Sequence, residues 1–213
     1  MSLSYKNING LYLINDFING EEENNLIYKI NNSEWTSQIK RKVQHYGYIF
    51  DYKNKKINKN SIIELPEWVN SIIDKLKNIN FLKDFNPNQC TINEYIPGIG
   101  ISPHIDTHSS FTNIIISISL QNQIVMNFKD KTKNDNKIEI LLPPKSLLIL
   151  KDTVRYSFTH GISWRKTDNI NGKIVRRNTR LSITLREIIQ SPCKCKWSKL
   201  CDSQKAILEN TRL

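Results

Sequence analysis

The sequence predicts a mainly β fold of the α+β class, a double-sheet jelly roll (a double-stranded β-helix) with N-terminal helices packed on one face. Two observations lead to this prediction. From residue 89 onward, short apolar segments alternate with turn sequences such as Pro143-Pro144. Before residue 89, two segments carry apolar residues at helical spacing instead. The 213 residues, 38% of them hydrophobic, are enough for one domain with a full core.

The N-terminal elements are predicted from spacing and from the residues at their ends. Residues 11–18 predict a strand that leads into a helix over 20–31, whose acidic first turn complements the helix dipole. Residues 39–55 alternate in places and predict a basic, aromatic-rich hairpin or pair of loops. A second helix is expected over residues 66–82, because it begins with a proline and then has helical apolar spacing.

The jelly roll is predicted from eight short strands. They span residues 90–95, 101–106, 113–120, 123–128, 138–142, 146–151, 155–160 and 179–188. We see no internal repeat and no linker, so we expect a single domain over residues 1–213.

Composition suggests the partner and the compartment. A net charge of +11 suits a protein that meets a polyanion, with nucleic acid as the first candidate and a solvated lysine-rich surface as the alternative. No signal peptide and no apolar run of about 20 residues is present, so we expect no membrane partner. Four cysteines without a leader favour a reducing compartment, the cytoplasm or the nucleus.

Two histidines and a carboxylate suggest an iron site. His104 and Asp106 are two residues apart on a predicted strand, so they share a face, and His160 ends another predicted strand. Two His and one carboxylate form the facial triad that holds non-haem Fe(II). Each residue alone is more often structural. Downstream, Arg180 and Arg186 also share a face, either as exposed strand charges or as clamps for an acidic co-substrate.

Longer runs carry a family resemblance. The chain contains NEYIPGIGISPHID, RYSFTHGI and RLSITLR, which resemble the AlkB family of Fe(II)- and 2-oxoglutarate-dependent dioxygenases. One branch of that family hydroxylates a modified wobble uridine in tRNA. Its oxygenase domain is similar to the runs RKVQHYGYIFDY, HIDTHSSF, SISLQNQIVMNFK, LLPPKSLLIL and SPCKCKWSKLCDSQ, so that the resemblance spans roughly residues 10 to 205.

The resemblance implies a role for each residue of the site. His104, Asp106 and His160 would ligate Fe(II), and Arg186 would lie near the iron end, steadying Asp106 or the nearer carboxylate of 2-oxoglutarate. The expected chemistry consumes O2 and 2-oxoglutarate and yields succinate and CO2.

The far end of the co-substrate has its own expected partners. By resemblance, Arg180 would pair with the distal carboxylate of 2-oxoglutarate. Asn93 and Tyr95, two residues apart and therefore on one face of a strand, would add hydrogen bonds.

Cysteines near the C-terminus predict a second metal. Cys193, Cys195 and Cys201 fall within nine residues, which suggests a structural Zn2+ site that needs a fourth ligand. Cys90 or a histidine could supply it, and the resemblance favours His108. Free or redox-active thiols are the alternative.

Two basic segments are candidates for nucleic-acid contacts. Lys40, Arg41 and Lys42, with Tyr46 and Tyr48 nearby, could form a lid whose cations contact phosphates and whose rings stack on a base. A second basic loop holds Arg165, Lys166, Lys173, Arg176 and Arg177. Either segment could instead be a solvated face.

Three tryptophans are left open between two roles. The sequence supports two roles equally for Trp35, Trp164 and Trp197: packing in the core or stacking on a base.

We therefore expect residues 10–88 to hold the helices and a substrate lid, 89–188 the jelly-roll core, and 189–205 a zinc-binding tail. The resemblance implies hydroxylation of 5-methoxycarbonylmethyluridine in tRNA, with a separate tRNA methyltransferase supplying the ester. Oxidative demethylation of N-alkylated bases in RNA or DNA is the alternative. A catalytically silent RNA-binding module is a third possibility, which the intact ligand set and both arginines disfavour.

Overall fold

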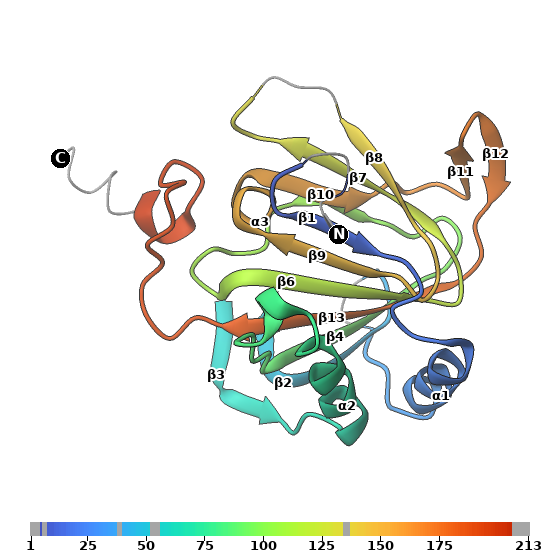
Figure 1. The fold of residues 1–213 in the computed structure, drawn as a ribbon, viewed down its shortest axis with the longest axis horizontal. Coiled ribbons are helices and arrows are strands. Elements are labelled where there is room, and N and C mark those ends of the chain that lie inside the picture. Colours follow the sequence, from blue (N-terminus) through green and yellow to red (C-terminus); the bar gives the residue numbers. More distant parts are fainter. Residues whose placement is uncertain (1–4, 6–7, 38–39, 52–55, 134–136, 206–213) are drawn as a thin grey trace.

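The computed structural model describes residues 5, 8–37, 40–51, 56–133 and 137–205 (Figure 1). The helices are α1 (Gly20–Asn31), α2 (Glu67–Leu76), a short 3-10 helix (Asn80–Leu82) and α3 (Asp152–Ser157). The N-terminal strands are β1 (Leu11–Ile14), β2 (Val43–Asp51) and β3 (Lys56–Ile63). The remaining strands are β4 (Gln89–Tyr95), β5 (Ile101–His104), β6 (Phe111–Leu120), β7 (Ile124–Asp130), β8 (Ile138–Leu142), β9 (Leu147–Lys151), β10 (Phe158–Ile162), β11 (Thr167–Ile170), β12 (Lys173–Arg176) and β13 (Arg180–Ile188).

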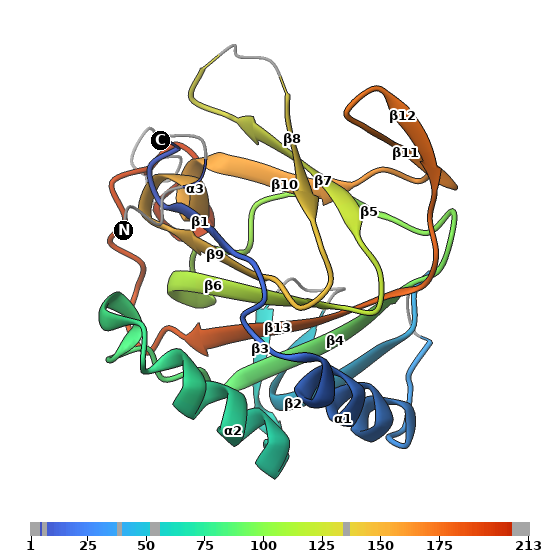
Figure 2. The same ribbon diagram turned by 45° about the vertical axis from the view of Figure 1, so that its right-hand side comes forward.

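Eleven of the described strands form two antiparallel sheets that face each other, as the jelly-roll prediction requires, and β11 and β12 form a separate two-stranded sheet. The larger sheet has seven strands in the order β1-β9-β6-β13-β4-β2-β3, and the smaller has four in the order β5-β10-β7-β8. Figure 2 shows the smaller sheet stacked over the larger one, with α1 and α2 on the far side of the larger sheet. The predicted fold class is confirmed.

The helices cover the outer face of the larger sheet. Asn19 caps α1, because its side chain accepts from the Glu22 amide (2.8 Å) while the Glu22 carboxylate accepts from the Asn19 amide (2.7 Å). Glu22 also accepts from Lys75 of α2 at 2.6 Å, which links the two helices. The apolar core under them includes Leu26, Ile30, Trp68, Val69, Ile72, Leu76, Ile92, Ile118 and Ile183.

Strand β13 separates this core from the interior of the jelly roll. Leu181, Ile183 and Leu185 point into the helix-side core, while Arg180 and Arg186 point the other way, between the two sheets. The alternation predicted for this strand is therefore confirmed, and it places the arginines in the interior rather than in solvent.

Three predicted segments differ from the structure. Residues 155–160 do not form one strand: helix α3 ends at Ser157, and His160 lies in the middle of β10 rather than at a strand end. The hairpin predicted over 39–55 is shifted, because β2 pairs with β3 as far as Ile63, and residues 52–55 lie outside the described chain. The basic loop before β13 is a hairpin, β11–β12.

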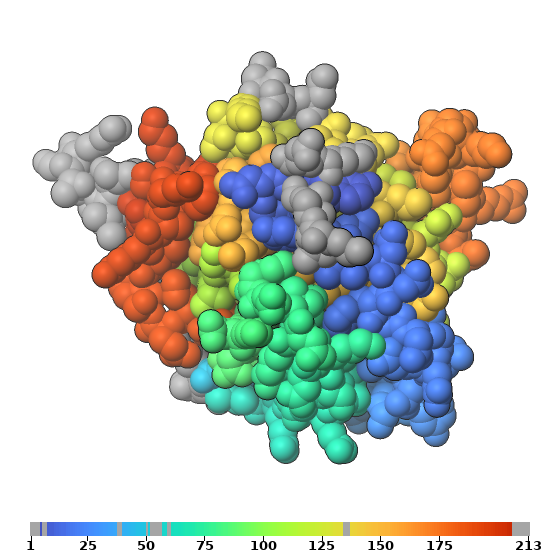
Figure 3. Space-filling model, in the orientation of Figure 1, coloured from blue at the N-terminus to red at the C-terminus, as the bar shows by residue number. Residues whose placement is uncertain are grey.

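The ends of the sandwich carry different attachments. The segment after β13 and the β11–β12 hairpin lie at opposite sides of the molecule in the space-filling view (Figure 3). Among the described residues, no helix has both the length and the apolar character needed to cross a membrane.

Candidate active site and metal centres

A cavity of about 1030 Å³ lies between the two sheets. Strands β4 and β13 of the larger sheet line one side, and β5 and β10 of the smaller sheet line the other. All of the residues predicted for iron and co-substrate binding line this cavity: His104, Asp106, His160, Asn93, Tyr95, Arg180 and Arg186. The structure therefore brings together residues that are far apart in sequence.

Three of these side chains converge on one point. His104 and His160 are direct partners in the pairing of β5 with β10, and Asp106 follows β5 by two residues. One ligand atom from each of the three lies within 4.8 Å of the other two. Such a group, two imidazoles and one carboxylate on one side of a cavity, could hold a divalent transition metal and leave positions open.

The carboxylate of Asp106 has the charge and the free oxygen that a metal ligand needs. Its Oδ1 accepts from Arg186 Nε at 2.8 Å, and its Oδ2 is 3.5 Å from His160 Nε2. Burial alone would raise the pKa of Asp106, but the positive charge of Arg186, followed by the nearby histidines, lowers it below the ordinary value. Among the described residues, the buried Oδ2 has no hydrogen-bond partner. A buried anionic oxygen of this kind requires another partner, and a cation fits it.

The two histidines present ring nitrogens that a metal could use. Burial, reinforced by the neighbouring His104, lowers the pKa of His160 to about 3, so its imidazole is neutral at physiological pH. His104 Nδ1 lies 2.9 Å from the carbonyl oxygen of Ser102 and must donate to it. In the neutral imidazole this hydrogen bond places the proton on Nδ1, and Nε2 is then the nitrogen whose lone pair can bind a metal.

Arg180 is a buried cation facing the same cavity. It is 1% exposed, donates to Ser119 Oγ at 2.8 Å from Nη2, and lies 5.5 Å from the ring of Tyr95. Burial lowers the pKa of Arg180 to about 10, which still leaves it charged at neutral pH. No carboxylate in the described part of the chain pairs with it. A buried charge of this kind calls for an anionic ligand, and a carboxylate fits a guanidinium in two-point contact.

The mouth of the cavity is lined by residues before β2 and after β10. Lys40, Arg41 and Trp164 all line it, and Lys40 Nζ is 5.3 Å from the centre of the Trp164 ring. Trp164 is 46% exposed, as expected for a residue at a rim. The sequence placed Lys40 in the predicted lid but did not decide between core and stacking for Trp164. A tryptophan four residues after a candidate metal ligand was the available signal.

The predicted lid is only partly placed at this mouth. Arg41 lines the cavity, but Lys42 points outward, 55% exposed, and reaches Glu94 at 3.8 Å. Tyr46 lies on the helix side of the sheet, edge-on to Trp68 at 6.0 Å. Tyr48 packs against the core between the sheets without lining the cavity. Tyr46 packs in the helix-side core and Arg41 lines the cavity on the other face of the sheet, so a base stacked in the cavity cannot contact Tyr46.

The second predicted basic segment is also different in the structure. Arg177 is buried and donates to both oxygens of Asp168 (2.7 and 2.8 Å), and Arg165 donates to the same carboxylate at 2.7 Å. Their charge is therefore used to hold the β11–β12 hairpin against the body of the protein. Lys166, Lys173 and Arg176 remain available to solvent or to a partner.

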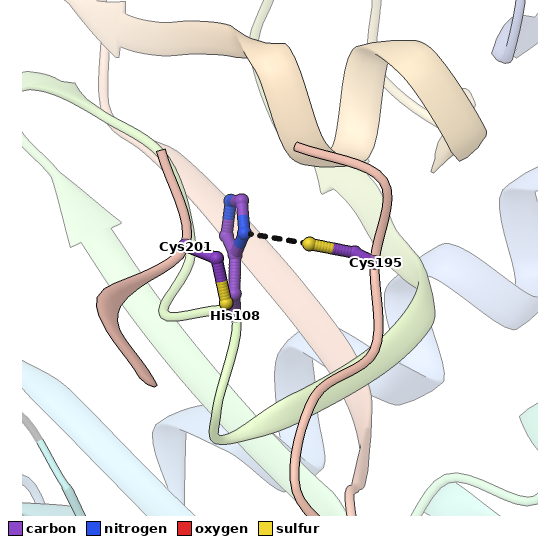
Figure 4. Close-up of side chains that lie close together, drawn as sticks. All are labelled: His108, Cys195 and Cys201. Atoms are coloured by element: carbon purple, nitrogen blue, oxygen red, sulfur yellow. Dashed lines mark hydrogen bonds between the residues drawn. The ribbon is translucent and has the colours of Figure 1, made fainter. Parts of the chain in front are cut away.

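A second cluster of metal-type ligands lies beside the first. His108 follows Asp106 by two residues, and its Nδ1 is 3.4 Å from the sulfur of Cys195 (Figure 4). One ligand atom each from His108, Cys195 and Cys201 lie within 4.8 Å of one another. Cys193 is buried in the same small core as Cys201, and its pKa responds to both other tail cysteines. The converging ligand atoms found among the described residues therefore come from three of the four predicted ligands, and Cys193 lies in the adjoining core without joining that group. Sulfur and imidazole ligands of this kind suit Zn2+.

The alternative fourth ligand, Cys90, is not available. It is fully buried in the helix-side core, and burial raises the pKa of its thiol well above the ordinary value. The tail itself is fastened to the loop after β5, because the Asp202 carboxylate accepts hydrogen bonds from the amide and the hydroxyl of Ser109.

One residue that supports both clusters was missed by the sequence analysis. Arg155 of α3 is 2% exposed and donates to four backbone carbonyls at the loop between β5 and β6. These are the carbonyls of Asp106 (2.7 Å), Thr107 (3.1 Å), Phe111 (3.1 Å) and Thr112 (3.1 Å). The loop carries Asp106 and His108, so one guanidinium fixes the backbone of both metal-type clusters.

The fold and the cavity together define the class. A jelly roll that presents two imidazoles, a carboxylate and a buried arginine to one cavity has the features of an Fe(II)- and 2-oxoglutarate-dependent oxygenase. The sequence profile of the 2OG-Fe(II) oxygenase superfamily matches residues 10–186. An Arabidopsis thaliana protein named as an alkylated DNA repair protein, ALKBH8 homolog, is 37% identical over 93% of this chain and 64% of its own length.

Two further comparisons agree. Mouse tRNA (carboxymethyluridine(34)-5-O)-methyltransferase ALKBH8 is 37% identical over 92% of this chain, which spans 33% of the mouse protein. The solved structure of OsALKBH1 superposes with a TM-score of 0.64 at 18% identity, covering 84% of this chain and 96% of that one, which supports the fold. The chain belongs to the 2OG-Fe(II) oxygenase superfamily and, within it, to the AlkB family.

Proposed function

We propose that this AlkB-family dioxygenase hydroxylates the 5-methoxycarbonylmethyl side chain of the modified wobble uridine in tRNA. The observation that carries the oxygenase part is the cavity itself. In it, one buried Asp106 oxygen has no hydrogen-bond partner among the residues that the structure describes, two histidines lie beside it, and the buried Arg180 lines the same cavity. The likeness to ALKBH8 proteins over more than nine-tenths of the chain supports the choice of tRNA.

Each residue of the cavity has a proposed task. His104, Asp106 and His160 would hold Fe(II), and Arg180 would hold the distal carboxylate of 2-oxoglutarate, with hydrogen bonds from Asn93 and Tyr95. With Fe(II), 2-oxoglutarate and O2 bound, the site supplies an oxidant that replaces a C–H hydrogen of the substrate by hydroxyl, with succinate and CO2 as the other products. Arg186 keeps Asp106 ionised and oriented, since it donates to the oxygen that the metal would not use.

The mouth of the cavity is suited to an unpaired base. Lys40 and Trp164 combine a cation with an exposed aromatic ring at the rim, the pair of features that proteins use to contact the phosphates and stack on the bases of single-stranded RNA. A tRNA substrate would place the enzyme inside the cell, in the cytoplasm or the nucleus. A methyltransferase, in the same or in another polypeptide, would supply the ester before hydroxylation.

The test is mass spectrometry of nucleosides from total tRNA incubated with the protein, Fe(II), 2-oxoglutarate and ascorbate. Hydroxylation adds one oxygen to 5-methoxycarbonylmethyluridine and releases no formaldehyde. His104→Ala and Asp106→Ala should abolish this product and leave tRNA affinity within about two-fold, because neither residue lies at the rim. If the unaltered protein turns over 2-oxoglutarate but adds no oxygen to this nucleoside, the proposal is refuted.

The alternative is oxidative demethylation of N-alkylated bases. The relative from Arabidopsis thaliana is named as a repair protein for alkylated DNA, which is the observation that favours it. The same chemistry on an N-methyl group releases formaldehyde in a one-to-one ratio with succinate, so a formaldehyde assay with methylated oligonucleotides decides between the two.

We further propose that His108, Cys193, Cys195 and Cys201 bind a structural Zn2+ ion. The convergence of three of these ligand atoms, from His108 of the loop after β5 and from Cys195 and Cys201 of the tail, supports this, and Cys193 is buried in the adjoining small core. Purified protein stripped of iron should retain one zinc per chain, and removing it should make residues 189–205 sensitive to protease. Absence of zinc with the thiols of Cys193, Cys195 and Cys201 freely titratable would refute the site.

A further inference from the structure

Arg41 stands at the junction between the mouth of the cavity and the wall where the co-substrate is expected. It precedes β2 in a segment that runs along β4, since the Lys42 carbonyl accepts from the Glu94 amide at 3.0 Å. Arg41 Nε donates to the side-chain oxygen of Asn93 at 2.8 Å. Its guanidinium carbon is 5.9 Å from the ring of Tyr95.

This contact determines which end of the Asn93 amide remains for a ligand. A guanidinium only donates, so Arg41 engages the oxygen of Asn93 and leaves its NH2 group. Asn93 is 6% exposed and lines the cavity, and within the described residues its NH2 group makes no hydrogen bond. A carboxylate accepts only, so it needs that donor. If the Asn93 amide were reversed, its oxygen would face the carboxylate of the co-substrate, and two hydrogen-bond acceptors would meet.

We infer that Arg41 is a positioning residue: it fixes the orientation of Asn93 for the co-substrate and thereby couples co-substrate binding to closure of the segment at residues 40–43. The inference rests on the proposed placement of 2-oxoglutarate beside Asn93. It does not depend on the identity of the nucleic acid.

The coupling has a thermodynamic consequence. If Arg41 bonds to Asn93 best when the NH2 group of Asn93 is bound to a carboxylate, then 2-oxoglutarate stabilises the closed segment. By reciprocity, the closed segment raises the affinity for 2-oxoglutarate by the same factor. Binding of the small co-substrate would thus prepare the mouth of the cavity before nucleic acid arrives.

The test is a double-mutant cycle on equilibrium binding of 2-oxoglutarate, measured by calorimetry with Mn(II) in place of Fe(II), so that no turnover occurs. Arg41→Met keeps an aliphatic chain beside Tyr95 but removes the donor. We expect it to weaken binding about ten-fold, as expected for loss of a charge-assisted hydrogen bond. In the Asn93→Ala background the same change should have no effect, because there is no amide left to orient.

Lys42→Met is the matched control. It removes one positive charge from the neighbouring position, and its side chain points outward, so it should leave binding within about two-fold. A second readout is amide hydrogen exchange: 2-oxoglutarate should slow exchange at residues 41–44 in the unaltered protein and not in Asn93→Ala. Melting curves without ligand identify any variant that has lost its fold, and Arg41→Leu, which also lacks a donor, then replaces Arg41→Met.

The outcomes separate the possibilities. If Arg41→Met weakens binding equally in both backgrounds, Arg41 acts only as a nearby charge and the inference is wrong. Equal effects of Arg41→Met and Lys42→Met would also overturn it. If the unaltered protein binds no 2-oxoglutarate, the proposed function falls first. If it binds the co-substrate normally while Arg41→Met has no effect, only this inference falls.

Discussion

Arg180 shows how a single residue can favour function at the expense of stability. Its guanidinium is almost completely buried, and in the described chain it has hydroxyl but no carboxylate partners. Burying a charge without a counter-charge is costly, so the folded protein without ligand holds this residue in an unfavourable state. An anionic co-substrate bound beside Arg180 would supply the missing counter-charge. The burial of Arg180 would then strengthen binding of that co-substrate.

Arg180→Met should therefore separate stability from binding. We expect the melting temperature without ligand to stay the same or rise, while affinity for 2-oxoglutarate falls about ten- to a hundred-fold through loss of the charge-assisted contact. Thermal unfolding with and without 2-oxoglutarate and Mn(II) measures both quantities. A large loss of stability in the absence of ligand would instead make Arg180 a structural residue.

At the residue scale, the sequence alone predicted which side chains share a face of a strand. Asn93 and Tyr95, and Arg180 and Arg186, share faces because they are separated by even numbers of residues in unbroken strands. The aromatic residues of β2 were harder, because Tyr46 and Tyr48 are two apart and yet pack in different cores, and Gly47 between them has a positive φ of 72° that interrupts the regular alternation. Lys40 and Trp164 meet only through tertiary contact, which no local pattern encodes.

At the scale of elements, helix α3 and the loop after β5 form one unit. The sequence predicted a strand over residues 155–160 because the segment is short and aromatic. The helix is held in place because Arg155 satisfies carbonyls 43 to 49 residues earlier in the chain. Local sequence patterns do not reveal those partners, so the sequence indicated the metal ligands and missed the residue that supports them.

Arg155→Met should impair both metal-type clusters together. Four carbonyls would lose their donor, all of them in part-buried or buried hydrogen bonds, and we expect the free energy of unfolding to fall by at least about 3 kcal/mol. Metal content per chain, measured after loading with Fe(II) and Zn2+, should fall for both ions. Arg165→Met, which removes contacts with Asp168 and Glu139 and none with either cluster, is the control. Loss of one metal with full retention of the other would contradict this role.

On the scale of the whole molecule, acid should destabilise the protein. Burial, then the charges of Arg186 and Arg41, lower the pKa of His45 to about 4, against an unfolded value near 6.5. Between these two pKa values the unfolded state binds a proton at His45 and the folded state does not. The contribution of His45 to the free energy of unfolding is therefore complete above about pH 6.5 and is lost as pH falls towards 4.

The measurement is the free energy of unfolding in urea between pH 4 and pH 7. Each histidine of this kind contributes a slope of at most about 1.4 kcal/mol per pH unit in that window. His45→Gln should reduce the slope by the contribution of one proton. An unchanged slope would show that His45 titrates normally in the folded protein.

The net charge of +11 predicts a second property of the whole molecule. Affinity for tRNA should fall at least ten-fold between about 50 and about 200 mM salt, because phosphate contacts release counterions. Binding of 2-oxoglutarate inside the cavity should change far less. Filter binding over a salt series measures the slope, and Lys40→Met should reduce it by about one. A flat salt dependence would contradict a phosphate-binding surface.

The two halves of the reaction centre belong to different sheets. The imidazoles come from β5 and β10 of the smaller sheet, and the proposed co-substrate arginine and amide come from β13 and β4 of the larger sheet. The pair between Asp106 and Arg186 crosses the interval between them. On the proposed function, activity would therefore depend on the spacing of two layers. A slight slippage of one against the other, with every hydrogen bond inside each layer intact, would leave a folded protein whose proposed iron ligands and proposed co-substrate ligands no longer reach the same bound molecule.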